Sequence, residues 1–245
     1  MKNFYFLLLF LVSVTVVNAQ SGYLDTSFGT DGFVSTVVKG TYSMTWGTVV
    51  QPDGKIVVVG QTGEPATYKA FAIRYNTDGT LDTSFGVDGK QVLPIGSVKS
   101  FAIDVALQSD GKIVMSGYTW DNVTGDVFVI RLNTYGSLDN SFGTDGVALV
   151  NNSTDVTESI AIQTDGKILI GGYTDDSFTV VRFNSGGTLD TDFGNNGWAK
   201  VNFGMASYIN DIALQNDGKI VAAGFAIGGV YQMAAARLNA DGILR

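Results

Sequence analysis

Three short motifs recur along this chain in a fixed order, and their recurrence constrains the fold more than any other feature. The first motif reads LDTSFGTDG at 24–32, LDTSFGVDG at 81–89, LDNSFGTDG at 138–146 and, more loosely, LDTDFGNNG at 189–197. The second reads QPDGKIVVVG at 51–60, QSDGKIVMSG at 108–117, QTDGKILIGG at 163–172 and QNDGKIVAAG at 215–224. The third reads AIRYN at 72–76, VIRLN at 129–133, VVRFN at 180–184 and AARLN at 235–239. A period of roughly 55 residues indicates an array of structural repeats, with copies near 24–80, 81–137, 138–188 and 189–245.

The residues around each Asp-Gly pair predict a tight turn between two strands. In the stretch 51–54, Pro and Asp suit the central turn positions and Gly54 takes the left-handed conformation, as Gly111, Gly166 and Gly218 do in the other copies. Strands are expected at 46–51, 55–60 and 70–76, and the segment 33–39 begins the next unit. About four short strands per repeat match one propeller blade. The sequence therefore predicts an all-β, propeller-like repeat array of about four four-stranded blades.

The last repeat stops inside its most regular motif. The chain ends NADGILR at 239–245, so that Leu244 stands where Leu81 does and Arg245 stands where Asp82 does. A terminal repeat normally carries a polar cap, and none is visible. We therefore expect an open, curved array with an exposed final edge, derived from a longer parent. The alternative is a closed propeller in which 32–39 pairs with the last blade.

The first residues have the pattern of a signal peptide. Lys2 precedes an apolar run from Phe4 to Val17, and Ala19 supplies a small residue for cleavage. The run is shorter than the roughly 20 residues of a membrane-spanning helix, which disfavours an uncleaved anchor. We expect a signal peptide within 1–20, a repeat domain over 21–245, a secreted or cell-surface location and no membrane insertion after cleavage.

Composition excludes several classes of function. A net charge of −8 with 15 Lys plus Arg gives no electrostatic footprint for nucleic acid. The chain has no Cys and no His, which excludes Ser-His-Asp and Cys-His catalysis, His-ligated zinc and a lipid-anchored cysteine. No phosphate-binding or dinucleotide-binding fingerprint is present. No cofactor is expected.

An arginine interrupts an apolar strand in every repeat. These residues are Arg74, Arg131, Arg182 and Arg237. A buried arginine needs a charged partner, and an aspartate stands eight residues later in three copies, namely Asp82, Asp139 and Asp190. We predict that each arginine forms one structural ion pair or one centre of hydrogen bonds per blade. A ring of cations for an anionic ligand is the alternative.

The aspartates of the LD motif suggest either calcium ligands or turn formers. They lie in pairs six residues apart with a serine between them: Asp25 and Asp31 around Ser27, Asp82 and Asp88 around Ser84, and Asp139 and Asp145 around Ser141. The spacing departs from the known calcium loop, whereas aspartate and serine side chains readily bond nearby backbone amides. We predict turns and no metal site.

Length varies between repeats in the segments 64–69, 120–126 and 175–177, which are expected to be exposed hairpin tips. Asp175 with Asp176, or Glu158 with Asp155, would be the carboxylate pair of a glycosidase. The aromatic side chains near the tips either stack on a sugar or protein ligand or cover blade edges; they are Tyr68, Trp120, Tyr208 and Tyr231.

The three motifs together resemble the delta-60 repeat family of secreted and surface-attached bacterial proteins, from Leu24 to Arg245. The resemblance implies a β-propeller-type repeat and no catalytic residues. The sequence thus favours an exported, non-catalytic binding or scaffold module at the cell surface, with an unknown protein or glycan as its ligand. The alternative is a propeller enzyme, a glycosidase or lyase, acting on extracellular polysaccharide.

Overall fold

The computed structural model describes residues 22–96, 99–150 and 156–243, and every regular element in this part is a β-strand. The all-β prediction is confirmed. The strands are β1 (Tyr42–Val50), β2 (Ile56–Gly63), β3 (Lys69–Tyr75), β4 (Lys90–Leu93), β5 (Lys99–Leu107), β6 (Ile113–Trp120), β7 (Val127–Leu132), β8 (Val147–Val150), β9 (Val156–Ile162), β10 (Ile168–Thr174), β11 (Ser177–Phe183), β12 (Trp198–Val201), β13 (Ala206–Leu214), β14 (Ile220–Ile227) and β15 (Tyr231–Leu238). The predicted signal peptide lies outside the described residues. Within them, no helix has the length and apolarity needed to cross a bilayer.

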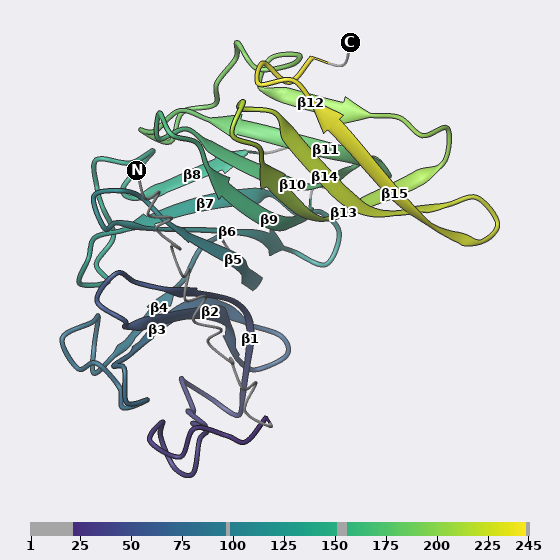
Figure 1. The fold of residues 1–245 in the computed structure, drawn as a ribbon. Coiled ribbons are helices and arrows are strands. Elements are labelled where there is room, and N and C mark those ends of the chain that lie inside the picture. Colours follow the sequence, from purple (N-terminus) through teal and green to yellow (C-terminus); the bar gives the residue numbers. More distant parts are fainter. Residues whose placement is uncertain (1–21, 97–98, 151–155, 244–245) are drawn as a thin grey trace, which may run out of the picture.

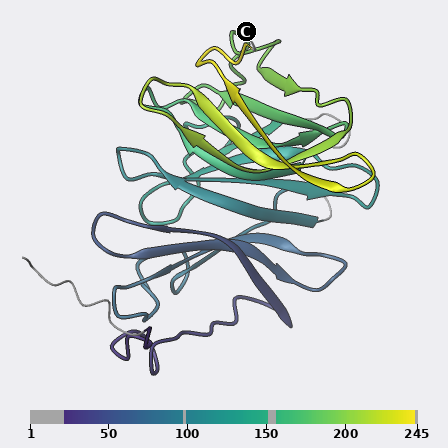
Figure 2. The same ribbon diagram turned by 45° about the vertical axis from the view of Figure 1, so that its right-hand side comes forward.

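The strands form four antiparallel sheets that stack in chain order (Figures 1 and 2). The sheets are β1-β2-β3-β4, β5-β6-β7-β8, β9-β10-β11-β12 and β13-β14-β15. Each packs on the next largely through its first strand, β1 against β5, β5 against β9 and β9 against β13. Within the described residues no comparable packing joins the fourth sheet to the first. The array is therefore an open propeller-like stack, as the sequence predicted.

Sheets and sequence repeats are offset by one strand. β4, β8 and β12 each follow the LD motif that opens the next sequence repeat, but they pair with the third strand of the sheet formed by the repeat before it. The segment 33–39 was expected to be a strand of the same kind, but among the described residues it forms only an isolated bridge between Thr30 and Phe33. It lies at the lower, purple end of Figure 1, where Val34 and Val38 pack against Phe71 and Ile73 of the first sheet.

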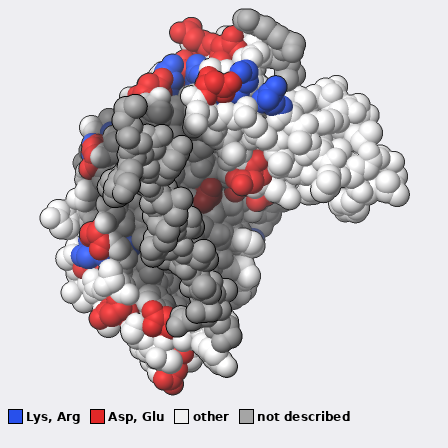
Figure 3. Space-filling view, viewed as in Figure 1, with Lys and Arg blue, Asp and Glu red and all other residues white. Residues whose placement is uncertain are grey.

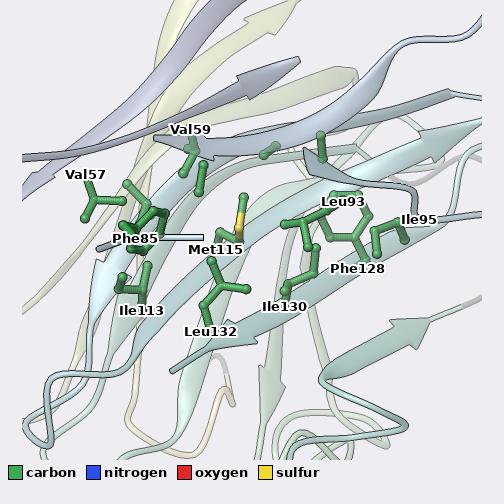
Figure 4. Packing of buried hydrophobic residues seen from close by; sticks show 14 residues of the cluster. Val57, Val59, Phe85, Leu93, Ile95, Ile113, Met115, Phe128, Ile130 and Leu132 are labelled. Atoms are coloured by element: carbon green, nitrogen blue, oxygen red, sulfur yellow. The ribbon is translucent and has the colours of Figure 1, made fainter. Parts of the chain in front are cut away.

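Apolar side chains fill each space between neighbouring sheets. Figure 4 shows the cluster between the first two sheets, where Val57 and Val59 of β2 face Ile113 and Met115 of β6. Phe85 of the LD motif lies in the same cluster and is fully buried. Its equivalents Phe142 and Phe193 are also fully buried. Each of these LD motifs therefore supplies one core aromatic ring to the stack.

The Asp-Gly turns close the first hairpin of every sheet. Gly54 N–H donates to the carbonyl of Gln51 over 2.8 Å, and Asp53 accepts a hydrogen bond from the amide of Lys55. The φ angles of Gly54, Gly111, Gly166 and Gly218 are 83, 83, 83 and 82°. A side chain at this φ would be strained, which explains why the turn uses glycine in all four copies.

Candidate functional site

A buried arginine joins each of the first three sheets to the next. Arg131 Nε lies 2.7 Å from Asp139 Oδ2, and Arg131 Nη1 donates over 2.7 Å to the carbonyl of Ser185, in the turn that follows β11 of the next sheet. The guanidinium carbon stands 4.7 Å from the ring centre of Phe142. Arg74 and Arg182 make the same contacts with Asp82 and Asp190. These three guanidinium groups are held by protein partners, which favours a structural role.

Each of these aspartates has a second cation partner that sequence reasoning missed. It is the lysine of the DGK turn: Lys55, Lys112 and Lys167 reach Asp82, Asp139 and Asp190 over 2.8, 3.0 and 2.8 Å. Burial alone would raise the pKa of Asp82, but hydrogen bonds from Lys55 and Ser84 and the charge of Arg74 hold it far below its usual range. The carboxylates therefore remain ionised in the folded stack. The lysine recurs at the same position of every DGK motif, and this recurrence could have indicated the contact from the sequence.

Arg237 differs from the other three arginines. It is exposed on β15 and forms no ion pair within the described part of the chain. Position 245, where its aspartate would stand, is Arg245. The expectation of one buried pair per repeat thus does not extend to the fourth sheet.

The aspartates of the LD motifs also shape turns. Asp25, Asp82 and Asp139 each accept hydrogen bonds from the amide and hydroxyl of the serine two residues later. Asp31, Asp88 and Asp145 adopt φ angles of 54, 52 and 52°. In the residues that the structure describes, no three acidic side chains are grouped to hold a metal ion. Absence of a metal requirement stays a prediction.

Grooves separate neighbouring DGK turns at what we call the turn rim, the edge of the stack that carries these turns. A groove of about 630 Å³ between the second and third sheets is lined in part by Gln108, Arg131 and Gln163. A second groove of about 440 Å³, between the first two sheets, is lined by the corresponding Gln51 and Arg74. Because the same repeated residues line both grooves, the grooves follow from the stacking itself.

The opposite edge, here called the tip rim, is formed by the starts of β1, β5, β9 and β13 and by the hairpin tips. A β-bulge interrupts the first strand of every sheet within the strand, at the central residue in β1, β5 and β13. The bulged residues are Trp46, Ile103, Glu158 and Asn210, all at least partly exposed. Bulges re-aim side chains and occur often beside functional sites. Four equivalent positions carry four different side chains, so the first strands depart from the repeat at the bulge.

A glycine opposite each bulge is required by close backbone approach. A Cβ on Gly117 would overlap the carbonyl oxygen of Phe101, and Gly60, Gly172 and Gly224 meet the equivalent carbonyls. This contact explains the last glycine of the QPDGKIVVVG motif. The bulge itself was not foreseen, because its residues differ between repeats.

Side chains beside the bulges tie neighbouring first strands together. Asp104 Oδ2 accepts the amide of Ile160 over 2.9 Å, and Ser159 Oγ accepts the amide of Ile212 over 3.3 Å. Ser159 also donates to Asp211 over 2.7 Å. Burial, with a smaller effect from the nearby charge of Asp211, raises the pKa of the Asp104 carboxyl. These contacts fix where the bulged residues stand.

Two rows of aromatic rings run along the tip rim. The first row contains Tyr42, Tyr68, Phe101 and Tyr118, with successive ring centres 5.3, 6.0 and 5.0 Å apart. The second contains Tyr173, Tyr208, Phe225 and Tyr231, with spacings of 4.7, 5.1 and 5.5 Å. All eight rings are at least partly exposed. Three of the four aromatic residues singled out from the sequence, Tyr68, Tyr208 and Tyr231, belong to these rows, and Trp120 ends β6 at the same rim.

Glu158 lies between the two rows. Its negative charge contributes to the raised pKa of both Tyr118 and Tyr173, for which burial is the larger cause. Partial desolvation also raises the pKa of the Glu158 carboxyl, although this side chain remains accessible to solvent. The tip rim thus combines eight rings with a carboxyl near its middle.

The other candidate acids have local partners. Asp175 and Asp176 form the β10–β11 turn with φ angles of 48 and 56°. Asp176 accepts from the hydroxyl of Tyr208 over 2.7 Å, and Asp175 contacts Lys200 at 3.1 Å. The proposed pair of Glu158 with Asp155 cannot be placed, since Asp155 lies outside the described residues. On the face seen in Figure 3, acidic groups occur from top to bottom while basic groups are few.

The four-sheet architecture and the repeated arginine–aspartate–lysine cluster, here called the hub, define a β-propeller repeat protein. The chain matches the model of a family described as a domain of unknown function (DUF5122) beta-propeller over 51–85, 108–142, 163–193 and 215–244, together more than half of its length. The chain belongs to this family. Among solved structures, the GH43 endo-arabinanase from Bacillus licheniformis is similar at 14% identity, covering 82% of this chain and 73% of that chain with a TM-score of 0.40. No curated protein matches the chain.

Proposed function

We propose that this protein is an exported, non-catalytic binding module of the bacterial cell surface, and that its tip rim binds a neutral glycan. The proposal is consistent with the signal-peptide pattern of residues 1–20 and with the resemblance to delta-60 repeats. One observation carries it: partly exposed aromatic rings line the tip rim across all four sheets. Aromatic faces offer apolar area with little conformational freedom to lose, and the apolar faces of sugar rings pack well against them.

The negative charge of the molecule favours a neutral glycan over an anionic one. The chain has a net charge of −8, and acidic Glu158 stands between the two aromatic rows. An anionic polysaccharide would be repelled by this surface. A neutral polysaccharide meets no such penalty, and the hydroxyl groups of Tyr118 and Tyr173 can hydrogen-bond to it.

The test is binding of the mature chain to laminarin, xylan and dextran, with alginate as the anionic control. We expect retention by at least one neutral polysaccharide and none by alginate. Tyr118→Ala and Tyr173→Ala should each weaken binding about two- to tenfold. Tyr135→Ala is the matched control, because Tyr135 is exposed but lies on the turn rim. Binding by none of the neutral polysaccharides, or equal losses in all three variants, would overturn the proposal.

An enzyme acting on extracellular polysaccharide is the second candidate, favoured by the raised pKa of Glu158. A carboxyl group with a raised pKa keeps its proton to a higher pH and can then serve as a general acid. Incubation with the same polysaccharides followed by a reducing-end assay separates the two functions. Release of sugar that Glu158→Gln abolishes would establish the enzyme and overturn the non-catalytic proposal.

A further inference from the structure

The stack has three interfaces between neighbouring sheets, and the middle interface, between the second and third sheets, differs from the two flanking ones. At the turn rim all three are joined alike, because Arg74, Arg131 and Arg182 each donate to a carbonyl in a turn of the next sheet. All three interfaces lie inside the stack, so a contrast between them is independent of what contacts either outer sheet. The differences lie toward the tip rim.

A buried serine ties the sheets together at the tip rim in both flanking interfaces. The amide of Ala70 donates to Ser100 Oγ over 2.9 Å, and the amide of Ser100 donates to the carbonyl of Tyr68 over 3.0 Å. Ser207 makes the equivalent two contacts between the third and fourth sheets. Asp155 stands at the matching position of the middle interface and lies outside the described residues. Both flanking interfaces are therefore fastened at the tip rim as well as at the turn rim.

An aromatic contact also crosses each flanking interface. The ring centres of Tyr68 and Phe101 are 6.0 Å apart across the first interface, and those of Tyr173 and Tyr208 are 4.7 Å apart across the last. At the strand position of Phe101 and Tyr208, the third sheet carries Val156. The middle interface therefore has no ring at this position, which is why the tip rim carries two aromatic rows instead of one continuous row.

The interior of the middle interface contains hydroxyl groups at positions that are apolar in the first interface. Ser116 of β6 and Thr157 of β9 are fully buried, and neither hydroxyl has a hydrogen-bond partner among the described residues. The strand register gives Ser116 the position that Val59 has in the first sheet, and Thr157 the position that Ala102 has in the second. Val59 and Ala102 belong to the apolar cluster between those sheets. Since a buried hydroxyl without a partner costs free energy, the middle interface is the least favourable of the three at this point.

Strand packing is also less extensive at the middle interface. A Cβ at Gly47 would stand 2.8 Å from Cα of Asp104, so β1 and β5 approach closely. Asp104 itself has the position of Gly47 on β5, and its carboxylate accepts the amide of Ile160 on β9 over 2.9 Å. Further from the first strands, β3 packs against β5 and β11 against β13, whereas β7 makes no comparable contact with β9 within the described residues.

We propose that the middle interface is a hinge, at which the first two sheets and the last two sheets move as two halves. The pivot is at the turn rim, where the bond from Arg131 to the carbonyl of Ser185 holds the halves together. Opening separates the halves toward the tip rim. It breaks no aromatic contact there, and it gives water access to the hydroxyls of Ser116 and Thr157, which lack partners when the halves are closed. Hinge motion of packed bodies about a few fixed contacts is a common conformational change in proteins.

The hinge gives the tip rim more than one spacing between its two aromatic rows. Each row lies wholly on one half, the first on the first two sheets and the second on the last two. A glycan chain that contacts both rows therefore favours the spacing at which it binds more tightly. This consequence rests on the proposed glycan binding, whereas the hinge itself does not.

The test measures distances between spin labels by double electron–electron resonance. The chain has no cysteine, so pairs of introduced cysteines carry the labels. Val123→Cys with Lys200→Cys places one label on each half, whereas the pairs at Ala66 and Val123 and at Lys200 and Val230 each lie within one half. All four residues are exposed, and each control pair shares a position with the pair across the hinge. We expect a broad or two-peaked distance distribution across the hinge and a single narrow peak for both control pairs. Equal widths for the three pairs would overturn the proposal.

A double variant tests whether the buried hydroxyls are the cause. Ser116→Val with Thr157→Ala gives the middle interface the residues that the first interface has at these positions. We expect the distribution between labels at Val123 and Lys200 to sharpen, the melting temperature to rise and both control pairs to stay unchanged. An unchanged distribution across the hinge would overturn the assignment of the motion to this interface.

The neutral polysaccharide that binds best among laminarin, xylan and dextran then tests the link to binding. We expect it to shift the distribution between Val123 and Lys200 toward one of the distances found without it. A broad distribution in the free protein together with no polysaccharide binding would overturn only the proposed function. Binding that leaves the distribution unchanged would overturn the link between the hinge and the aromatic rows.

Discussion

Replacing Arg131 by alanine should destabilise the protein by about 3–5 kcal/mol, the range for breaking a buried ion pair. The side chains of Arg131 and Asp139 are both 9% exposed, so the remaining carboxylate would keep only partial access to water. The substitution also removes the 2.7 Å bond to Ser185 and the contact with the ring of Phe142. It therefore weakens the second sheet and its packing on the third.

Two control variants distinguish the effect of removing a buried cation from the effect of removing an exposed one. Lys112 contacts the same aspartate at 3.0 Å, but its side chain is 29% exposed, so Lys112→Ala should cost under about 1 kcal/mol. Arg237 occupies the same repeat position as Arg131 but is exposed, so Arg237→Ala should have little effect in a monomer at low concentration. Urea unfolding of the three variants checks these values. Equal losses for Arg131→Ala and Arg237→Ala would refute the structural role of the hub.

Three further predictions follow from the same contacts. Gly117→Ala should cost about 1–3 kcal/mol of folding stability, because the added Cβ would overlap the Phe101 carbonyl oxygen. Gly186→Ala is the control and should leave the melting temperature unchanged, because there is open space around Gly186. Equal melting temperatures for the two variants would contradict the close approach at Gly117. The pKa values of Asp82, Asp139 and Asp190 are lowered in the folded protein, so these carboxylates bind protons more readily in the unfolded chain than in the folded one. Their contribution to stability should therefore be complete above about pH 4 and decline as the pH falls further. A stability that is unchanged down to about pH 2 would contradict this. Melting curves with excess calcium and with chelator should coincide, because the LD-motif acids are engaged in turns and ion pairs; a calcium-dependent rise would reveal a site.

The turn residues and the constant spacing between motifs were the sequence features that predicted the most about the structure. The Asp-Gly turns were predictable, because a left-handed residue between two apolar strands demands glycine. Pairing of Arg74 with Asp82 followed from their constant spacing and from the cost of burying a lone guanidinium. Lys55 was not assigned to the same aspartate, because a lysine after a turn ordinarily faces solvent.

The features that sequence reasoning missed depend on neighbouring sheets. Pairing of β3 with β4 takes a strand from the next repeat, and motif boundaries alone do not reveal this offset. The bulge at Glu158 breaks the two-residue alternation, which gives no periodic signal. Arg237 is exposed on β15, whereas Arg74, Arg131 and Arg182 are buried at the same motif position, so the motif alone does not determine the environment of its arginine.

The most direct test of the proposed glycan-binding rim is hydroxyl-radical footprinting with and without the neutral polysaccharide, among laminarin, xylan and dextran, that binds best. The reactivities of Tyr118, Tyr173 and Tyr208 are compared with that of Tyr135, which is 68% exposed on the turn rim and serves as an internal reference. We predict that the polysaccharide protects the three tip-rim tyrosines and leaves Tyr135 unchanged. Protection of Tyr135 alone, or of none of the four, would contradict the assignment of binding to the tip rim.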